Sequence, residues 1–269
     1  MSIRLGIIGG GVMAEAILTR LLASQLYPAN TLLVSEPQTS RREFLAQTYG
    51  VGVTDSNQET LQATEALLLA IKPQILDKVV SQLTLDGVEN YPLVLSILAG
   101  TPLNRLEKAF PNFPVIRVMP NTPATVGAGM TAIAPGTRVE PSHLTLATSI
   151  FGAVGEVVEV SESLMDGVTG LSGSGPAFVA LMIEALSDGG VASGLPRAIA
   201  TKLAIQTVLG TATLIKETGL HPGELKDKVT SPGGTTIAGV SKLEEKGFRS
   251  AVIEAVKTAY QRSQELGKK

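Results

Sequence analysis

Three small residues near the start of the chain have the spacing of a loop that binds dinucleotides. Gly9, Gly11 and Ala14 match the pattern Gly-x-Gly-x-x-Gly/Ala, between an apolar run and a stretch of helical periodicity. Glycine at 9 permits a tight turn, glycine at 11 lets a pyrophosphate approach the backbone, and a small residue at 14 lets the helix pack on its strand. The helix N-terminus, with Val12 and Met13 directly after Gly11, offers free N–H groups to the phosphates. We predict that this loop binds a cofactor; the alternative is a glycine-rich turn without a ligand.

The residues after the second predicted strand, 31–35, bear on which dinucleotide binds. Proteins that bind NAD place Asp or Glu there to bond the ribose 2′-hydroxyl, whereas NADP binders use small polar and basic residues. Ser35 stands at this position and Arg41 follows closely, which favours the 2′-phosphate of NADPH. Glu36 leaves NADH open as the alternative, and Arg41 and Arg42 also fit a solvated helix face.

Further strand ends are predicted to meet the same cofactor, because ligands of such sheets bind beyond the carboxyl ends of the strands. The apolar run at 66–71 is typical of a buried parallel strand, and it ends in Lys72 and Pro73. A backbone contact is favoured there over a catalytic role for Lys72. Asn121 follows a later strand, and its amide is a candidate for orienting the nicotinamide; the alternative is a turn Asn that bonds its own backbone. The cofactor contacts predicted from these strand ends are Ala70, Lys72, Pro73, Ala99 and Asn121.

Composition excludes several classes of protein. The 269 residues are 44% hydrophobic and 17% charged with a net charge of −2, so we expect a packed core and no nucleic-acid partner. Cysteine is absent and the two histidines, His143 and His221, lie far apart, so we predict neither thiolate chemistry nor a metal site. We expect no targeting segment, and the longest apolar run, 177–186, is too short to span a bilayer. We therefore expect a cytoplasmic protein with no membrane partner.

Two domains are predicted from the order of elements. Residues 1–161 alternate strand and helix, which predicts an α/β Rossmann-type, doubly wound parallel sheet that binds NAD(P). Residues 162–269 contain no predicted strand and form an all-α domain for dimerisation and substrate binding. Its few aromatic residues make a thin core, which predicts an obligate homodimer. Its helices are predicted at 163–191, 196–217, 222–228, 237–245 and 248–266.

Three stretches of the second half resemble pyrroline-5-carboxylate reductases. They lie at 170–178, 227–236 and 243–249, and the Ser-Pro-Gly-Gly-Thr-Thr run at 231–236 is the most specific. With the glycine loop and the Met-Pro-Asn-Thr-Pro turn at 119–123, the match covers nearly the whole chain in order. The resemblance implies reduction of 1-pyrroline-5-carboxylate to L-proline by hydride transfer from NAD(P)H to the cyclic imine, the last step of proline synthesis. A decamer of dimers is a further assembly that it leaves open.

The run at 231–236 is predicted to bind the carboxylate of the imine. Its glycines let the backbone come close, and it leads into a helix whose N-terminus offers N–H groups. By the resemblance, Thr236 is catalytic, with its hydroxyl facing the ring nitrogen, and Ser231 lies in the same pocket. The alternative is an ordinary helix cap. The predicted substrate-binding residues are Ser231, Gly233, Gly234, Thr235, Ser174 and Gly175, of which the last two fit close helix packing equally well.

Alternatives from other classes stay open. Related β-hydroxyacid dehydrogenases carry a catalytic lysine four residues after the last glycine of a Gly-x-x-Gly-x-Gly segment, and Val179 stands there in this chain. Oxidation of an alcohol needs a base, whereas reduction of a protonated imine does not, so Val179 favours the imine. A redox-sensing regulator that only binds a dinucleotide would leave the 231–236 run unexplained. A purely structural dimerisation protein would leave the glycine loop unexplained.

Overall fold

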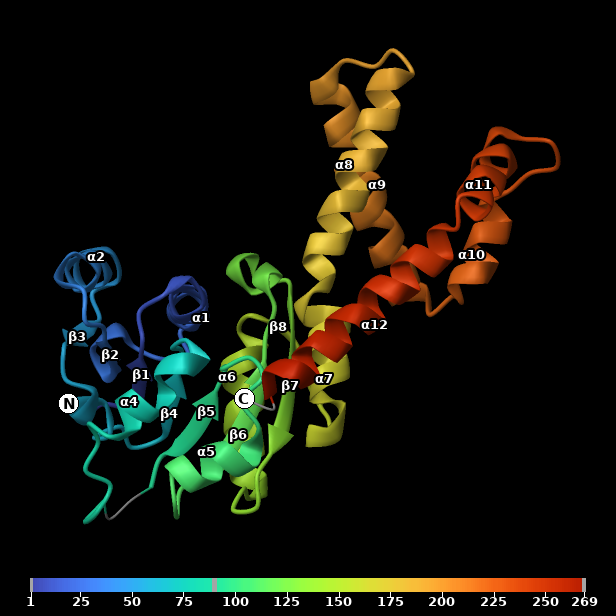
Figure 1. Cartoon of the computed structure of the whole chain (residues 1–269). Helices are drawn as coiled ribbons and strands as arrows, with labels where there is room; N and C mark the ends of the chain where they lie inside the picture. Colours follow the sequence, from blue (N-terminus) through green and yellow to red (C-terminus); the bar gives the residue numbers. More distant parts are fainter. Residues whose placement is uncertain (1, 89–90, 268–269) are drawn as a thin grey trace. The chain divides into compact units, whose positions relative to one another are not determined.

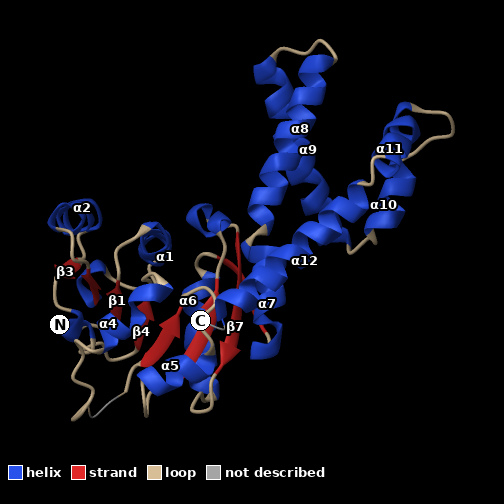
Figure 2. Cartoon of the chain, viewed as in Figure 1, coloured by secondary structure: helices blue, strands red, loops and turns tan. Residues whose placement is uncertain are grey.

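The computed structural model describes residues 2–88 and 91–267 (Figure 1). By compactness the chain divides into two units. Unit 1 comprises Met1–Gly173 with Ala259–Lys269, and unit 2 comprises Ser174–Thr258. Strands and helices alternate in unit 1, whereas the regular elements of unit 2 are helices (Figure 2). The boundary predicted between residues 161 and 162 stays a prediction, because compactness does not by itself define a functional domain.

Unit 1 is built on one eight-stranded sheet, with the strand order β3-β2-β1-β4-β5-β6-β7-β8. The strands from β3 to β6 run parallel, so their carboxyl ends lie along one edge. Strands β1, β2, β4 and β5 are buried along their whole length, as strands covered on both faces must be. The strands are β1 Leu5–Ile8, β2 Leu32–Ser35, β3 Gly52–Thr54, β4 Ala66–Leu69, β5 Leu93–Ser96, β6 Val115–Met119, β7 Gly129–Pro135 and β8 Gly155–Glu159.

Two hydrophobic clusters form the core of unit 1. Ile7 packs in the cluster that contains Ile17 of α1, whereas Ile8 packs in the cluster that contains Leu106 of α5. Successive side chains of a strand point to opposite faces, so helices must cover both faces of the sheet. The helices of unit 1 are α1 Val12–Ala23, α2 Thr39–Tyr49, α3 Asn57–Thr60, α4 Leu76–Val80, α5 Leu103–Ala109, α6 Pro141–Gly152 and α7 Met165–Val168.

The predicted Rossmann-type class is confirmed, but the sheet is not parallel throughout. Strand β7 runs antiparallel to β6, with Ile116 opposite Pro135 and Met119 opposite Ala132. A parallel pair needs a crossover of a dozen or more residues, and only residues 120–128 separate β6 from β7. This short connection holds the 3₁₀ turn η3, Thr122–Val126, and it forces the chain to reverse direction.

The segment predicted as one helix at 163–191 is helical, but its helix type changes along its length. The chain forms the 3₁₀ turn η4 Glu162–Leu164, then α7 and the π-helical turn η5 Thr169–Gly173 in unit 1, and then α8 in unit 2. The helix at 237–245 begins two residues earlier than predicted, so Thr235 and Thr236 lie in its first turn. The helices are α8 Gly175–Ala192, α9 Arg197–Thr218, α10 Pro222–Val229, α11 Thr235–Glu245 and α12 Phe248–Gly267, which ends in unit 1.

Many large apolar side chains of unit 2 are exposed. Helices α8 and α9 pack against each other, yet Leu181, Leu203 and Leu209 are each more than half exposed. By length and composition alone, Glu162–Ala192 and Arg197–Thr218 are apolar enough to cross a membrane. Such faces need an apolar partner, since monomeric soluble proteins rarely expose large apolar patches.

Candidate active site

The carboxyl edge of the parallel strands brings the predicted cofactor residues together. Ile8 lies opposite both Ser35 and Leu69, and Leu69 lies opposite Ser96. The turns that follow these strands therefore lie in a row. The strand order reverses between β1 and β4, which is where dinucleotides bind in such sheets. The predicted contacts at this edge are Gly9, Gly11, Val12, Met13, Ser35, Arg41, Ala70, Lys72, Pro73, Ala99 and Asn121.

The glycine loop has the backbone geometry that its sequence predicts. Gly9 has φ +98°, and a Cβ there would lie 2.6 Å from the carbonyl oxygen of Ala70. Gly11 is the N-cap of α1, and a Cβ there would meet no atom within 4 Å. The first helical hydrogen bond runs from the Glu15 N–H to the Gly11 carbonyl (2.9 Å), so the N–H groups before it point out of the helix end. The exposed backbone at Gly11 and Val12 fits the pyrophosphate of a dinucleotide.

The residues predicted to determine the cofactor, after β2, belong to a network of polar side chains. Ser35 is 1% exposed and donates its hydroxyl to Asn57 Oδ1 (2.7 Å), so this hydroxyl already has a protein partner. Glu36 Oε2 accepts the Gly10 N–H (2.9 Å), and Arg41 Nε donates to the Gly10 carbonyl (2.7 Å). The predicted contacts of Ser35 and Arg41 with a 2′-phosphate stay predictions, but Arg41 does lie beside the loop.

Glu15 on α1 completes this network. Tyr49 donates its hydroxyl to Glu15 Oε1 (2.5 Å), and Arg41 forms an ion pair with the other carboxylate oxygen. The hydrogen bond from Tyr49, and then Arg41, lower the pKa of Glu15, while the same bond raises the pKa of Tyr49. The sequence alone does not reveal Glu15, Tyr49 or Asn57 as members of this network, because they follow no local motif and meet their partners only through the fold.

The contacts predicted for the nicotinamide end of the cofactor lie on the turns after β4, β5 and β6. The Ala70 N–H donates to the Ile8 carbonyl (2.9 Å), which joins this turn to the glycine loop. Lys72 is exposed and caps the 3₁₀ turn η2, Pro73–Ile75, and Ala99 is also exposed. Asn121 is half-buried, and its amide bonds both Ser172 and Met130. The alternative of a turn Asn that bonds its own backbone is therefore wrong, since both partners are distant in sequence.

The run at 231–236 forms the entry to α11. Gly233 has φ +64°, and a Cβ on Gly234 would lie 2.3 Å from Ser231 Oγ, so a larger residue there would force the Ser231 side chain to move. The first helical bond runs from the Ala238 N–H to the Gly234 carbonyl (3.4 Å). The N–H groups of Thr235 and Thr236 therefore lie at the helix end, where they can bind a carboxylate.

Ser174 and Gly175 lie at the start of α8, also in unit 2. Within this unit the start of α8 and the loop between α10 and α11 lie apart, so one chain does not bring the two groups of predicted substrate residues together (Figure 1). In the part of the chain that the structure describes, no group of three His, Cys, Asp or Glu residues could hold a metal ion.

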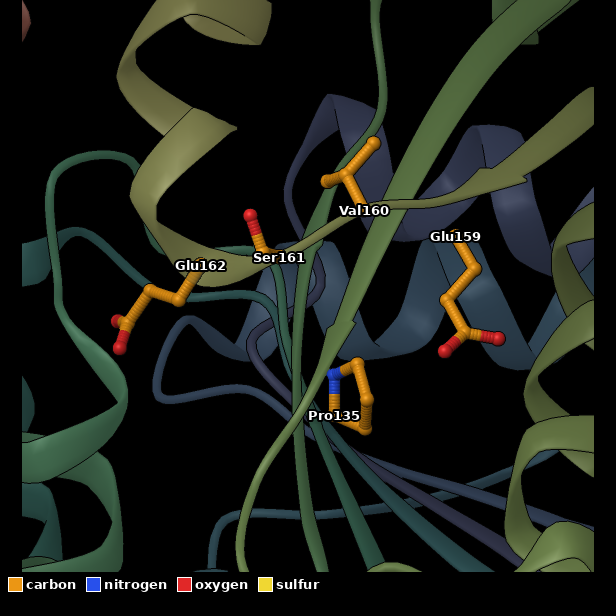
Figure 3. A pocket seen from close by; sticks show the side chains of 5 residues that line it. All are labelled: Pro135, Glu159, Val160, Ser161 and Glu162. Carbon is orange, nitrogen blue, oxygen red and sulfur yellow. The ribbon is translucent and has the colours of Figure 1, made fainter.

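Five residues line a pocket of about 480 Å³ (Figure 3). Its lining includes Pro135, which lies opposite Ile116 near the start of β6, and Glu159, Val160, Ser161 and Glu162 from the end of β8 onward. It therefore opens at the amino end of β6, whereas the candidate site follows the carboxyl ends of the parallel strands.

Comparisons with known proteins cover the whole chain. Residues 162–266 match a family model described as pyrroline-5-carboxylate reductase dimerisation, and residues 4–100 match one described as NADP oxidoreductase, coenzyme F420-dependent. The pyrroline-5-carboxylate reductase of Synechocystis is 66% identical over 269 residues, 100% of both chains. The chain belongs to the pyrroline-5-carboxylate reductase family.

Solved structures of pyrroline-5-carboxylate reductases share the fold of this chain. The enzyme of Coxiella burnetii is 35% identical with a TM-score of 0.91 and 100% coverage of both chains. The pyrroline carboxylate reductase of Plasmodium falciparum, solved with NADP bound, is 30% identical with a TM-score of 0.88 and 98% coverage of both chains. These findings confirm the predicted family, the two-part fold and an NADP-type cofactor. The roles of the individual site residues stay predictions.

Proposed function

We propose that this chain catalyses the NADPH-dependent reduction of 1-pyrroline-5-carboxylate to L-proline, the last step of proline synthesis. The observation that carries this proposal is the 66% identity to the Synechocystis reductase over the full length of both chains. Two exposed helix starts, at Gly11 and at Thr235, fit the two anionic groups of the reaction: the cofactor pyrophosphate and the imine carboxylate.

The reaction requires the protein mainly to hold the cofactor and the imine next to each other. When bound, NADPH supplies a hydride, which is two electrons and one hydrogen, to the imine carbon. The C=N bond becomes single and its electron pair moves to the ring nitrogen, which already carries a proton in the protonated imine and ends as a secondary amine. Thr236, half-buried in the first turn of α11, would hold the ring nitrogen through its hydroxyl. Because the protonated imine is already electrophilic, no side chain has to act as a base.

We further propose an obligate homodimer, formed through the apolar faces of unit 2. Residues 162–266 match the dimerisation model, and this range contains both helices that are apolar enough for a membrane. A second copy of the chain can cover these faces and can supply the group of substrate residues that one chain leaves apart. On this proposal the protein is cytoplasmic, with no membrane or nucleic-acid partner, and the dimers form a decamer. Light scattering of the pure protein tests the dimer and the decamer, and co-sedimentation with phospholipid vesicles tests the absence of a membrane partner.

Cofactor consumption with the five-membered imine acid tests the reaction. We expect rapid loss of NADPH absorbance and slower loss of NADH absorbance at equal concentration. Thr236→Ala should lower kcat/KM by about 10- to 100-fold, the range for one lost hydrogen bond to a charged group, and Thr236→Ser should restore much of it. Thr218→Ala is the matched control, since it removes a threonine hydroxyl bonded to the Leu214 carbonyl (2.6 Å) at the end of α9.

A regulator that binds the dinucleotide without chemistry is the competing outcome. Tight NADPH binding by the pure dimer, with no consumption of either cofactor in the presence of the imine acid, would refute the reductase. Faster turnover with NADH would leave the reductase intact and make Glu36 the residue that decides cofactor choice.

A further inference from the structure

Asn121 connects two segments of unit 1 that are far apart in sequence. Its Nδ2 donates to the Ser172 carbonyl (3.1 Å), and its Oδ1 accepts the Met130 N–H (2.9 Å). A carbonyl can only accept and a backbone N–H can only donate, so the two partners determine the orientation of the amide. The side chain therefore joins the start of β7 to the π-helical turn η5.

The turn η5 is the segment that Asn121 holds. Such π-helical turns are rare and occur frequently at functional sites. A Cβ on Gly173 would lie 2.7 Å from the terminal methyl of Met119, so glycine lets η5 lie this close to the end of β6. The turn is thus bound to the end of β6 in two ways: by packing at Met119 and by hydrogen bonding at Asn121.

The residues that directly follow η5 are Ser174 and Gly175, both predicted to bind the imine. We infer that Asn121 is a positioning residue of the imine site, which holds the Ser172 carbonyl and thereby the backbone that leads into Ser174 and Gly175. This inference rests on the proposed reductase function. It gives Asn121 a role different from the predicted contact with the nicotinamide, because Oδ1 and one N–H of the amide are already engaged within the protein.

Asn121→Asp keeps the hydrogen bond to Met130 and removes the one to Ser172. One carboxylate oxygen can still accept the Met130 N–H, while the other faces the Ser172 carbonyl in place of a donor. We expect the KM for the imine acid to rise about tenfold, the upper range for one lost hydrogen bond, with kcat and the Kd of NADPH changed by less than about twofold. Thr125→Ala is the matched control: it removes a hydroxyl bonded to the Thr122 carbonyl (2.9 Å) in the same connection and should leave the KM within about twofold of wild type.

The pH dependence of Asn121→Asp gives a readout that a merely structural role would not move. A carboxyl group that faces a carbonyl oxygen has a raised pKa, and its protonated form regains an O–H donor. The ratio of variant KM to wild-type KM should therefore fall as the pH is lowered from about 8 towards about 6. A constant ratio, or a rise in the Kd of NADPH that parallels the KM, would overturn the inference. A fall in kcat with unchanged KM and Kd would also overturn it.

Amide hydrogen exchange distinguishes failure of this inference from failure of the proposed function. In Asn121→Asp the amides of residues 170–175 should exchange faster than in wild type, whereas Thr125→Ala should leave them unchanged. Wild-type exchange in Asn121→Asp would overturn the inference even in an active reductase. Faster exchange in a protein whose wild type does not turn over the imine acid would support the positioning contact and refute the reductase.

Discussion

Substitution by alanine should lower the stability of the protein at Gly9 and weaken NADPH binding at Gly11. An Ala at position 9 must adopt φ +98°, which costs about 1–2 kcal/mol, and its Cβ must displace the Ala70 carbonyl 2.6 Å away, which costs a further 1–3 kcal/mol or so. We therefore expect Gly9→Ala to lose about 2–5 kcal/mol of unfolding free energy, roughly 5–20 °C in Tm for a unit of this size. NADPH binding should fall with the folded fraction.

Gly11→Ala should leave stability unchanged and weaken NADPH binding directly. The backbone at Gly11 (φ −72°, ψ −177°) suits any residue, and its Cβ would meet no protein atom within 4 Å. The weaker helix cap costs about 0.5–1 kcal/mol, and the stiffer unfolded chain offsets a similar amount. The new methyl instead occupies space that the pyrophosphate needs. Loss of one charge-assisted hydrogen bond, about 1.5–3 kcal/mol, raises the Kd of NADPH roughly 10- to 100-fold.

Thermal melting of the free protein and fluorescence titration with NADPH measure both effects. The reasoning requires a lowered Tm for Gly9→Ala and a wild-type Tm with a raised Kd for Gly11→Ala. A wild-type Kd for Gly11→Ala would mean that the pyrophosphate does not bind at the start of α1, and the assignment of this loop would then be wrong.

Three further substitutions test electrostatics and assembly. Burial, and then the hydrogen bond to Glu65 Oε2 (2.8 Å), raise the pKa of Tyr27. The raised pKa contributes stability that is complete below about pH 10 and is lost as the pH rises further. Tyr27→Phe should therefore cost about 1–2 kcal/mol of unfolding free energy at pH 7 and flatten the alkaline loss of stability in urea titrations. The lowered pKa of Glu15 contributes stability above about pH 4.5 that is lost as the pH falls, so Glu15→Gln should flatten the acid side of the same profile, and an unchanged acid side would contradict the Tyr49 bond. Leu209→Lys, on the exposed face of α9, should dissociate the dimer in light scattering; a dimer of wild-type affinity would show that this face is not the interface.

Local features of the fold were predictable because neighbouring residues encode them. Gly50 and Gly219 end α2 and α9 with φ 68° and 65°, the left-handed conformation that glycine after a helical pattern indicates. Helix α9 spans Arg197–Thr218, within one residue at each end of the range 196–217 that was predicted. The glycine loop is also encoded locally. Its tight turn, the close approach of Gly9 to the Ala70 carbonyl and the start of α1 all follow from the types of residues 9–14.

Features that depend on distant partners were not predictable. The direction of β7 depends on the length of its connection to β6. This length is known only when the end of β6 and the start of β7 are known. The turn η5 lies inside the range predicted as one helix, and its contacts with Met119 and Asn121 come from a segment about 50 residues earlier in the chain. Ser35 was identified as a small polar residue suited to a phosphate, whereas its hydroxyl bonds Asn57, which lies 22 residues away in sequence.

Contacts with the glycine loop explain why Glu36 and Arg41, the charged residues after β2, do not by themselves determine whether NADPH or NADH binds. Gly10 donates its N–H to Glu36 and accepts from Arg41 at its carbonyl, so both charged residues that enter the argument bond the same residue of the loop. Arg41 also pairs with Glu15, whose lowered pKa keeps it ionised at neutral pH. A 2′-phosphate bound there must compete with Glu15 for Arg41, and a ribose hydroxyl must compete with Gly10 for Glu36. If the cofactor binds there, the choice between NADPH and NADH depends on the difference between these two exchanges. Each exchange involves a partner 26 residues earlier in the chain, beyond the reach of a local motif.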